Sequence, residues 1–107
     1  MLNGADEGMG TMINSEDILE FLKGNKQDFF ERFSVIEIGL FGSYLNGESG
    51  EDSDIDILVR FKTPTFDNYM NLKFYLEEVF QKPVDLVLVD SLKPRLKPII
   101  EHEVAYA

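Results

Sequence analysis

Apolar residues recur along the chain with two different spacings, and these spacings divide it into helices and strands. Over residues 18–33 they return every three or four positions, the period of a helix with one buried face. Gly24-Asn25 interrupts this segment, which predicts a break or a kink. Ser15 is followed by two acidic residues and is predicted to be the N-cap. The first structured part of the chain is therefore predicted to be helical.

Three shorter segments predict strands. Residues 35–41 alternate apolar with other side chains and end at Gly42-Ser43, after which residues 46–53 are rich in Gly, Glu and Ser and predict a loop. Residues 54–61 form the second predicted strand. Residues 84–89 are almost all β-branched or aliphatic, which predicts a third strand buried on both faces.

Two more helices complete the predicted order. Residues 66–80 place their apolar side chains on about half of a helix circumference, and Lys82-Pro83 ends that helix. Residues 92–104 predict a closing helix in which Pro94 suits the first turn, whereas Pro98 would clash inside a helix already under way. The order α, β, β, α, β, α predicts an α+β fold, a small mixed β-sheet flanked by helices.

The chain ends of the predicted domain follow from composition and length. Residues 1–11 contain three Gly and two acidic residues without any apolar period, so we expect a disordered leader, with Met12 as an alternative start. Residues 12–107 are long enough for one buried core and too short for two. They are predicted to form a single domain.

Charge and cysteine content narrow the expected partners. Twenty acidic and ten basic residues give a net charge of −10, and the bases are scattered apart from Lys93, Arg95 and Lys97, so nucleic acid is not an expected partner. A basic protein suits such an acidic chain better. The absence of Cys excludes disulfides and thiolate metal sites and fits the cytoplasm. No apolar run reaches the ~18 residues of a membrane span, so no membrane association is expected.

Two carboxylates stand at the start of the second predicted strand. Asp54 and Asp56 alternate with aliphatic residues, so on a strand both point to the same face. Like charges held side by side repel unless a cation lies between them, and Mg²⁺ takes oxygen ligands and often a substrate phosphate as well. Gly42-Ser43 lies ten residues earlier at the end of the preceding strand. The pattern favours chemistry on a nucleotide, although Gly42-Ser43 taken alone is also compatible with an ordinary turn.

The segment LFGSYLNGESGEDSDIDILVRF, residues 40–61, resembles the signature of the minimal nucleotidyltransferases of the DNA polymerase β superfamily. That signature is a Gly-Ser pair, Asp-x-Asp on a strand about ten residues later, and a third Asp on a later strand. Asp85, within Pro83-Val84-Asp85-Leu86-Val87, is the third match; without the resemblance it is equally a turn-side residue. The similarity extends over residues 18–107, because the predicted order of elements is also that of the family.

The resemblance implies a polymerase-β-like fold and a set of roles. Asp54, Asp56 and Asp85 would bind divalent ions, Mg²⁺ or Mn²⁺, with Asp85 next to the acceptor hydroxyl. The backbone around Gly42 and the Ser43 hydroxyl would bind the triphosphate of ATP. The implied reaction is attack of a hydroxyl on the α-phosphate, which releases pyrophosphate and transfers AMP.

A protein partner is also implied by the resemblance. Stand-alone members of the family are typically paired with a small helical HEPN protein, an RNase toxin, and act as its antitoxin by adenylylating it, commonly at a Tyr. One position departs from the family pattern, because Asn46 stands where many members have a basic residue. A second class of function therefore stays open, a binding module that neutralises its partner by contact without turnover. The nucleotide used, the acceptor and the oligomeric state are not fixed by the sequence.

Two other ionisable residues are predicted to lie outside the site. Lys73 falls near the edge of the apolar stripe of residues 66–80, so its stem is expected to pack while its ammonium reaches water. A contact with an ATP phosphate is the alternative for Lys73. His102, on the closing helix, is predicted to be a surface residue rather than a general base.

Overall fold

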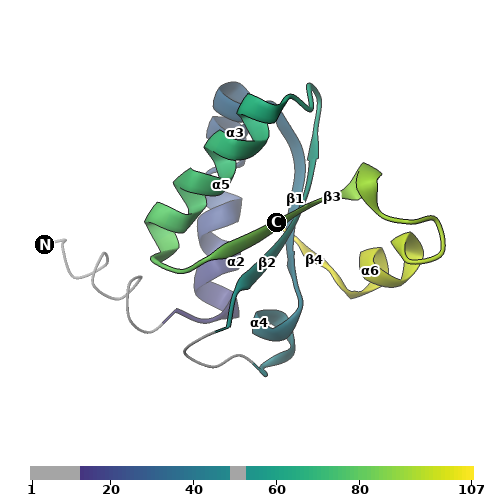
Figure 1. Ribbon diagram of the computed structural model, residues 1–107. Helices are drawn as coiled ribbons and strands as arrows, with labels where there is room; N and C mark the ends of the chain where they lie inside the picture. The colour runs from purple at the N-terminus through teal and green to yellow at the C-terminus, as the bar shows by residue number, and fades with distance from the viewer. Residues whose placement is uncertain (1–12, 49–52) are drawn as a thin grey trace, which may run out of the picture.

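The computed structural model describes residues 13–48 and 53–107 (Figure 1). The predicted disordered leader, Met12 and part of the predicted loop lie outside the described residues. Two helices, α2 (Ser15–Gly24) and α3 (Lys26–Phe33), open the described chain and are separated at Asn25, which confirms the predicted break. No helix in the described ranges is long and apolar enough to cross a membrane.

The first helix begins one residue earlier than predicted. Asn14, not Ser15, is the N-cap of α2: its side chain accepts a hydrogen bond from the Asp17 N–H at 2.9 Å. The Asp17 carboxylate in turn accepts from the Asn14 N–H at 3.2 Å, which completes a capping box. Both Asn14 and Ser15 are favourable cap residues. The residue three positions after the cap decides between them. For Asn14 it is Asp17, which can accept the hydrogen bond of a capping box, whereas for Ser15 it is Ile18, which cannot.

The central strands match the predicted ones closely. β1 (Val35–Phe41) and β2 (Ile55–Phe61) are antiparallel, and β3 (Val84–Leu88) runs parallel to β2. A parallel connection needs a crossover, and helix α5 (Phe66–Phe80) provides it. β3 is the end strand of the described sheet, whose order is β3-β2-β1-β4, where β4 is Ala105–Tyr106.

The prediction that the third strand is buried on both faces is wrong. Val84 and Leu86 are buried, whereas Asp85 is exposed. Helices α2, α3 and α5 lie on one side of the sheet, and the C-terminal helix lies on the other (Figure 1). An aliphatic strand at the end of a sheet covered in this way needs to bury only the side that faces the helices.

The C-terminal segment differs from the prediction of one closing helix. A short 3₁₀ turn, η1 (Val89–Ser91), precedes helix α6 (Lys97–Glu103), so Pro98 lies in the first helical turn, where a proline is tolerated. The chain then forms β4, which pairs with Gly39 and Leu40 of β1 and was not predicted. A Cβ at Gly39 would lie 2.9 Å from the Ala105 carbonyl oxygen, so this close approach requires glycine. The mixed sheet confirms the predicted α+β class.

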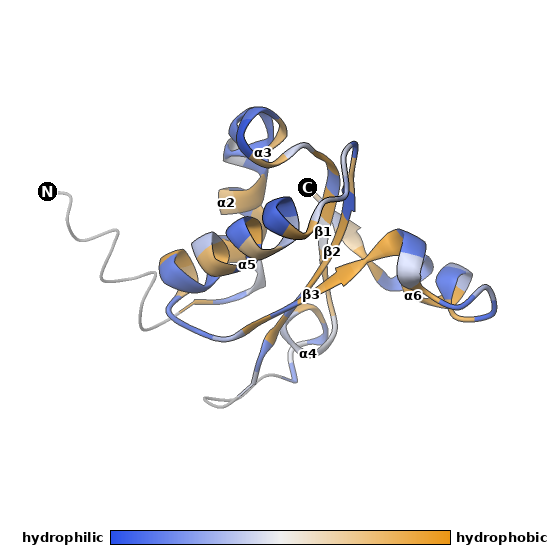
Figure 2. Ribbon diagram, turned by 45° about the horizontal axis from the view of Figure 1, so that its top comes forward, coloured by the Kyte–Doolittle hydropathy of each residue, from blue (hydrophilic) through white to orange (hydrophobic). Residues whose placement is uncertain are grey.

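The core lies between the sheet and helices α2, α3 and α5, where the hydrophobic colouring is concentrated (Figure 2). Ile55, Ile57 and Val59 of β2 are fully buried on this side. The aromatic residues of the first two helices contribute to the core, with Phe29 fully buried and in edge-on contact with Tyr75 of α5. Because alternate residues of a strand point to opposite sides, the burial of these aliphatic residues directs Asp56 to the other side of the sheet.

Candidate active site

Two of the three predicted aspartates are neighbours across adjacent strands. Asp56 of β2 is in register with Asp85 of β3, and on its other side with Phe41 at the end of β1. Asp85 alternates with buried Val84 and Leu86, so both carboxylates are on the sheet face opposite the helical layer. Adjacent strands are about 4.8 Å apart. The two acids therefore share one small area of surface.

The Gly-Ser pair is in direct contact with this area. Gly42 leads from β1 into a four-residue helix, α4 (Ser43–Asn46), at φ 79° and ψ −153°, a conformation close to the region that only glycine adopts readily. A Cβ at Gly42 would overlap the carboxylate of Asp56. The backbone N–H of Ser43 donates a hydrogen bond to the same carboxylate. The turn is thus packed against the acidic residues, as a phosphate-binding turn of this site would have to be.

Charge repulsion links the three aspartates. The pKa of Asp56 is raised above its ordinary value by burial, then by the charge of Asp85, then by that of Asp54, while the Ser43 N–H opposes the rise. Asp54 directly precedes β2 and is exposed. A cation near these carboxylates would relieve the repulsion, and hard oxygen donors are the ligands that Mg²⁺ and Mn²⁺ prefer. The donor set therefore fits a divalent metal.

The aspartates do not form a finished coordination site. Across residues 13–48 and 53–107, no three His, Cys, Asp or Glu side chains are grouped closely enough to hold a metal ion. Asp56 and Asp85 nevertheless share a face of the sheet, and the charges of both Asp85 and Asp54 act on Asp56. The fit to a metal consequently rests on the chemistry of the donors and on the raised pKa of Asp56, and not on a preformed cage.

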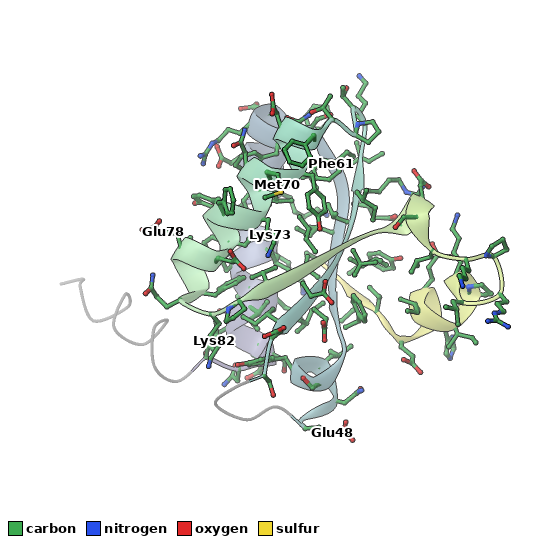
Figure 3. The ribbon with its side chains drawn as sticks, viewed as in Figure 1. Glu48, Phe61, Met70, Lys73, Glu78 and Lys82 are labelled. Carbon is green, nitrogen blue, oxygen red and sulfur yellow. The ribbon has the colours of Figure 1, made fainter. Side chains whose placement is uncertain are left out.

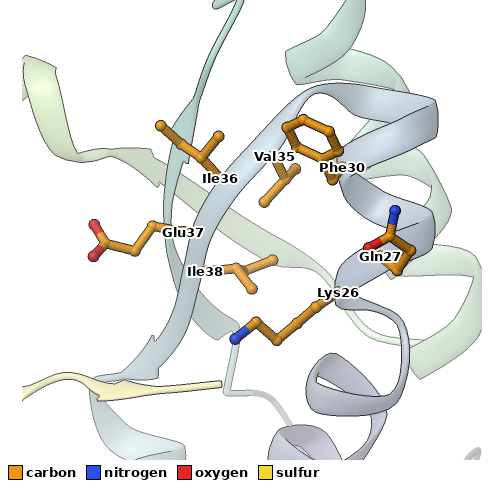
Figure 4. Close-up of a pocket in the computed structure, with 7 residues that line it drawn as sticks. All are labelled: Lys26, Gln27, Phe30, Val35, Ile36, Glu37 and Ile38. Carbon is orange, nitrogen blue, oxygen red and sulfur yellow. The ribbon is translucent and has the colours of Figure 1, made fainter.

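A groove elsewhere in the molecule lacks this chemistry. A pocket of about 240 Å³ lies between α3 and the beginning of β1 (Figure 4). Phe30 and Ile36 line it together with Glu37, whose carboxylate accepts a hydrogen bond from Arg60 at 3.2 Å. Asp56 pairs instead with the last residue of β1. The pocket is therefore not the place where the aspartates and the Gly-Ser turn meet.

Lys73 binds other groups of the protein while part of its side chain stays exposed. Its ammonium donates to the Glu77 carboxylate at 2.9 Å and to the Val84 carbonyl at 2.7 Å, and 27% of the side chain remains exposed. Tyr69 also donates to the backbone of β3, through Leu86 at 2.6 Å. Tyr69 and Glu77 were not singled out from the sequence, because their contacts depend on how α5 lies against β3. His102 is exposed, as predicted.

Comparisons with known proteins agree with this arrangement. A family model described as a nucleotidyltransferase domain matches residues 20–107. The protein adenylyltransferase MntA of Thermococcus cleftensis is 44% identical over 96 residues, which cover 89% of this chain and 97% of that protein. The polymerase-β-like fold and the enzyme class expected from the sequence are confirmed.

Solved structures resemble the chain over most of its length. One, provisionally assigned as a minimal nucleotidyltransferase, has a TM-score of 0.70 and 31% identity, covering 90% of this chain and 98% of its own. Another, a toxin-antitoxin structure with AMP-PNP, has a TM-score of 0.63 and 27% identity, covering 88% of this chain and 72% of its own. With the aspartates and the Gly-Ser turn in place, these matches show that the chain belongs to the nucleotidyltransferase domain family, in its minimal form.

Proposed function

We propose that this nucleotidyltransferase transfers AMP from ATP to a hydroxyl side chain of a protein partner, and that the partner is a HEPN-type toxin for which the chain is the antitoxin. The observation that carries the proposal is the contact of Gly42-Ser43 with Asp56, in register with Asp85. The 44% identity to a protein adenylyltransferase supports a protein acceptor. The similarity to a toxin-antitoxin structure with AMP-PNP supports both the partner and an adenine nucleotide.

Each residue of the site has a distinct task in this proposal. Asp54, Asp56 and Asp85 would hold Mg²⁺ or Mn²⁺, which when bound neutralises charge on the triphosphate and on the reacting oxygens. The Ser43 hydroxyl and the backbone at Gly42 would bind the triphosphate. The Asp56 carboxylate occupies the space that a side chain at Gly42 would need, so this turn lies directly against the metal-binding acids. Residues 12–107 would act together as one minimal nucleotidyltransferase domain.

The reaction balances without a further reagent. The acceptor oxygen forms a bond to the α-phosphorus of ATP, and the bond from that phosphorus to the bridging oxygen breaks, so its electron pair leaves with pyrophosphate. Asp85 takes the proton of the acceptor hydroxyl. Such a transfer depends mainly on positioning and on neutralisation of charge. Three carboxylates, the divalent ions that they would hold and a phosphate-binding turn are therefore nearly the whole requirement.

The charge of the chain supports a basic partner. A net charge of −10 on 107 residues accelerates encounter with a cationic surface and disfavours binding to nucleic acid. A basic RNase toxin has the complementary charge. The acidic site also requires metal for ATP to bind, because clustered carboxylates repel a bare triphosphate.

The test mixes the chain with a HEPN-type protein and Mg-ATP and weighs both proteins by mass spectrometry. We expect the partner to gain the mass of AMP on a hydroxyl side chain while pyrophosphate is released. Asp54→Asn and Asp56→Asn should abolish labelling. Glu48→Gln is the matched control, since it removes an exposed acid just beyond α4 and should leave labelling unchanged.

One observation favours the other function class. Asn46, at the end of α4, is exposed and stands where many family members have a basic residue, so one cationic phosphate contact is missing. A partner that stays unmodified, yet is inhibited equally well by the wild type and by the Asp variants, would overturn the enzymatic proposal. It would leave a module that neutralises its partner by contact.

A further inference from the structure

The outer edge of β3, the strand that carries Asp85, is bound by side chains instead of by another strand. Within the described residues β3 is the end of the sheet, so its outer N–H and C=O groups have no strand partner. The Pro83 carbonyl accepts a hydrogen bond from the Ile55 N–H of β2 at 3.0 Å. Because successive residues of a strand direct these groups to alternate edges, Val84 and Leu86 present theirs outward. Helix α5 lies along that edge, and Lys73 projects from it toward β3 (Figure 3).

Three side chains of α5 bind these outward groups. Tyr69 donates to the Leu86 carbonyl at 2.6 Å. Lys73 donates to the Val84 carbonyl at 2.7 Å, and Glu77 accepts from the Val84 N–H at 2.9 Å. The three residues are four positions apart, so they form one row along the helix surface. Both backbone groups of Val84 and the carbonyl of Leu86 are thereby fixed to α5.

We propose that Tyr69, Lys73 and Glu77 are positioning residues that hold Asp85 beside Asp56; this inference rests on the proposed function. They bind the backbone of Val84 and Leu86, which are the immediate neighbours of Asp85. A slip of β3 by one residue would turn the Asp85 carboxylate from the site to the helical side of the sheet. Pairing with β2 fixes one edge of the strand, and the row on α5 fixes the other.

The charges of the site explain why β3 needs contacts in addition to its pairing with β2. Asp85 and Asp56 are like charges in register on adjacent strands, so they repel each other, and an end strand has partners on one edge only. Two of the three contacts to β3 are made by charged groups, and such hydrogen bonds are stronger than neutral ones. Lys73 and Glu77 also bond to each other at 2.9 Å, so each orients the other. The hydrogen bonds from α5 therefore oppose the displacement of β3 that repulsion between Asp85 and Asp56 favours.

The test measures Mn²⁺ binding by calorimetry in the presence of a non-hydrolysable ATP analogue, beside steady-state kinetics. Glu77→Gln keeps the size of the side chain but loses its charge, and should weaken Mn²⁺ binding about tenfold, as expected for weakening one charge-assisted hydrogen bond. Tyr69→Phe removes only a hydroxyl and should have a smaller effect. Both variants should lower kcat more than they raise KM for ATP, because Asp85 acts at the attacking oxygen.

A double-mutant cycle separates positioning from general stability. In an Asp85→Asn background, Glu77→Gln should weaken Mn²⁺ binding no further, since the residue acts through Asp85. Asp28→Asn is the matched control: it breaks an i,i+4 acid–base pair with Arg32 on α3, at 3.0 Å, and contacts no part of β3. It should leave Mn²⁺ binding and kcat unchanged.

The outcomes that overturn the inference are distinct from failure of the proposed function. Wild-type binding of Mn²⁺ and the ATP analogue, with no change in Glu77→Gln and Tyr69→Phe, would show that the row on α5 merely covers an exposed strand edge. Equal losses of Mn²⁺ binding on adding Glu77→Gln to the wild type and to the Asp85→Asn background would show the same. Absence of metal-dependent analogue binding in the wild type would overturn both the proposed function and this inference.

Discussion

At the scale of single residues, Gly42 combines two constraints that only glycine satisfies. Its backbone has φ 79°, and its missing side chain leaves the space that the Asp56 carboxylate occupies. Gly47, at the end of α4, has a similar φ of 77° but nothing within 4 Å of an added Cβ. Because only Gly42 contacts the Asp56 carboxylate, substitutions at the two glycines separate the cost of the backbone conformation from the cost of that contact.

Gly42→Ala should therefore cost more than Gly47→Ala. Alanine at Gly47 meets only the backbone cost of a left-handed residue, about 1–2 kcal/mol. Alanine at Gly42 adds a collision with Asp56 and should also weaken Mg-ATP binding. Urea unfolding and calorimetry of both variants measure the two effects. Equal losses of stability with unchanged ATP affinity would show that Gly42 is an ordinary turn glycine.

Asp56 should make the folded protein less stable when it is ionised. Its pKa is raised in the fold, chiefly by burial and then by Asp85, so between its ordinary pKa of 3.8 and the raised value the folded state binds more protons than the unfolded state. Stability from this group therefore falls as pH rises through that window. Asp56→Asn should be more stable than the wild type at pH 7 without metal, and the difference should disappear in acid.

Urea unfolding of the wild type and of Asp56→Asn across pH measures that difference. The comparison cancels the titration of the other carboxylates, which both proteins share. A variant that is less stable than the wild type at pH 7 would mean that the hydrogen bond from Ser43 to Asp56 outweighs the repulsion.

The sequence predicts residues of the site where one strand alone decides their direction. The direction of Asp56 follows from the period of a strand, because Ile55 and Ile57 had to enter the core, whereas Asp54 lies one residue before β2. The register of Asp56 with Asp85 depends on pairing between strands separated by a helix, so the match to Asp85 needed the family resemblance. The hydrogen bonds of Tyr69 and Glu77 with the backbone of β3 cannot be predicted from a sequence pattern, since they depend on how α5 packs against that strand.

At the scale of elements, the junction between α5 and β3 should depend on the ionised form of Glu77. The pKa of Glu77 is lowered first by the hydrogen bond from the Val84 N–H and then by that from Lys73. A lowered pKa contributes stability that is complete above the ordinary value of 4.5 and is lost as pH falls through the lowered one. Glu77→Gln should therefore destabilise the protein at pH 7 by about 1 kcal/mol, the scale of one partly solvated hydrogen bond.

The same substitution should matter progressively less as the pH falls below 4.5. Urea unfolding at neutral and acid pH measures this, with Asp28→Asn as the comparison, because the Asp28–Arg32 pair is much more exposed than Lys73–Glu77. A Glu77→Gln effect that does not change with pH would contradict the charged hydrogen bond as its cause.

Elements with a long or strict period were predicted well, and those defined by contacts were not. α5 and β1 have the predicted bounds because many apolar residues follow one period in each. α6 begins late because Pro98 is tolerated only in a first turn. β4 has two residues and depends on Gly39 of a distant strand, so it has no period of its own to detect.

At the scale of the whole molecule, Arg60 connects the sheet to the C-terminal segment. Its guanidinium contacts Glu37 of β1 at 3.2 Å, Asp90 of η1 at 3.0 Å and Glu101 of α6 at 3.9 Å. In a chain of net charge −10, acidic residues outnumber basic ones by twenty to ten, and the aspartates of the site repel one another. The ion pairs of Arg60 therefore stabilise the region where the sheet meets η1 and α6. Repulsion among the aspartates destabilises the candidate active site.

Binding of Mg²⁺ should consequently raise the free energy of unfolding of the whole domain. A ligand that binds only the folded state stabilises it by about 2.7 kcal/mol at a hundred times its Kd. For a domain of about 100 residues, that corresponds to a rise in Tm of about 10–20 °C. The effect should saturate with Mg²⁺ concentration, and it should be lost in the double variant Asp54→Asn, Asp56→Asn.

Screening of the net charge of −10 would also raise Tm, so NaCl at matched ionic strength is the necessary reference. Screening acts on the whole surface and should stabilise the wild type and the double variant by similar amounts, whereas a site-bound ion stabilises only the wild type. Without metal, the double variant should be at least as stable as the wild type, because it has lost the repulsion among the aspartates. A clearly less stable double variant would mean that Asp54 and Asp56 hold the fold together, and equal effects of Mg²⁺ and NaCl would argue against a metal site.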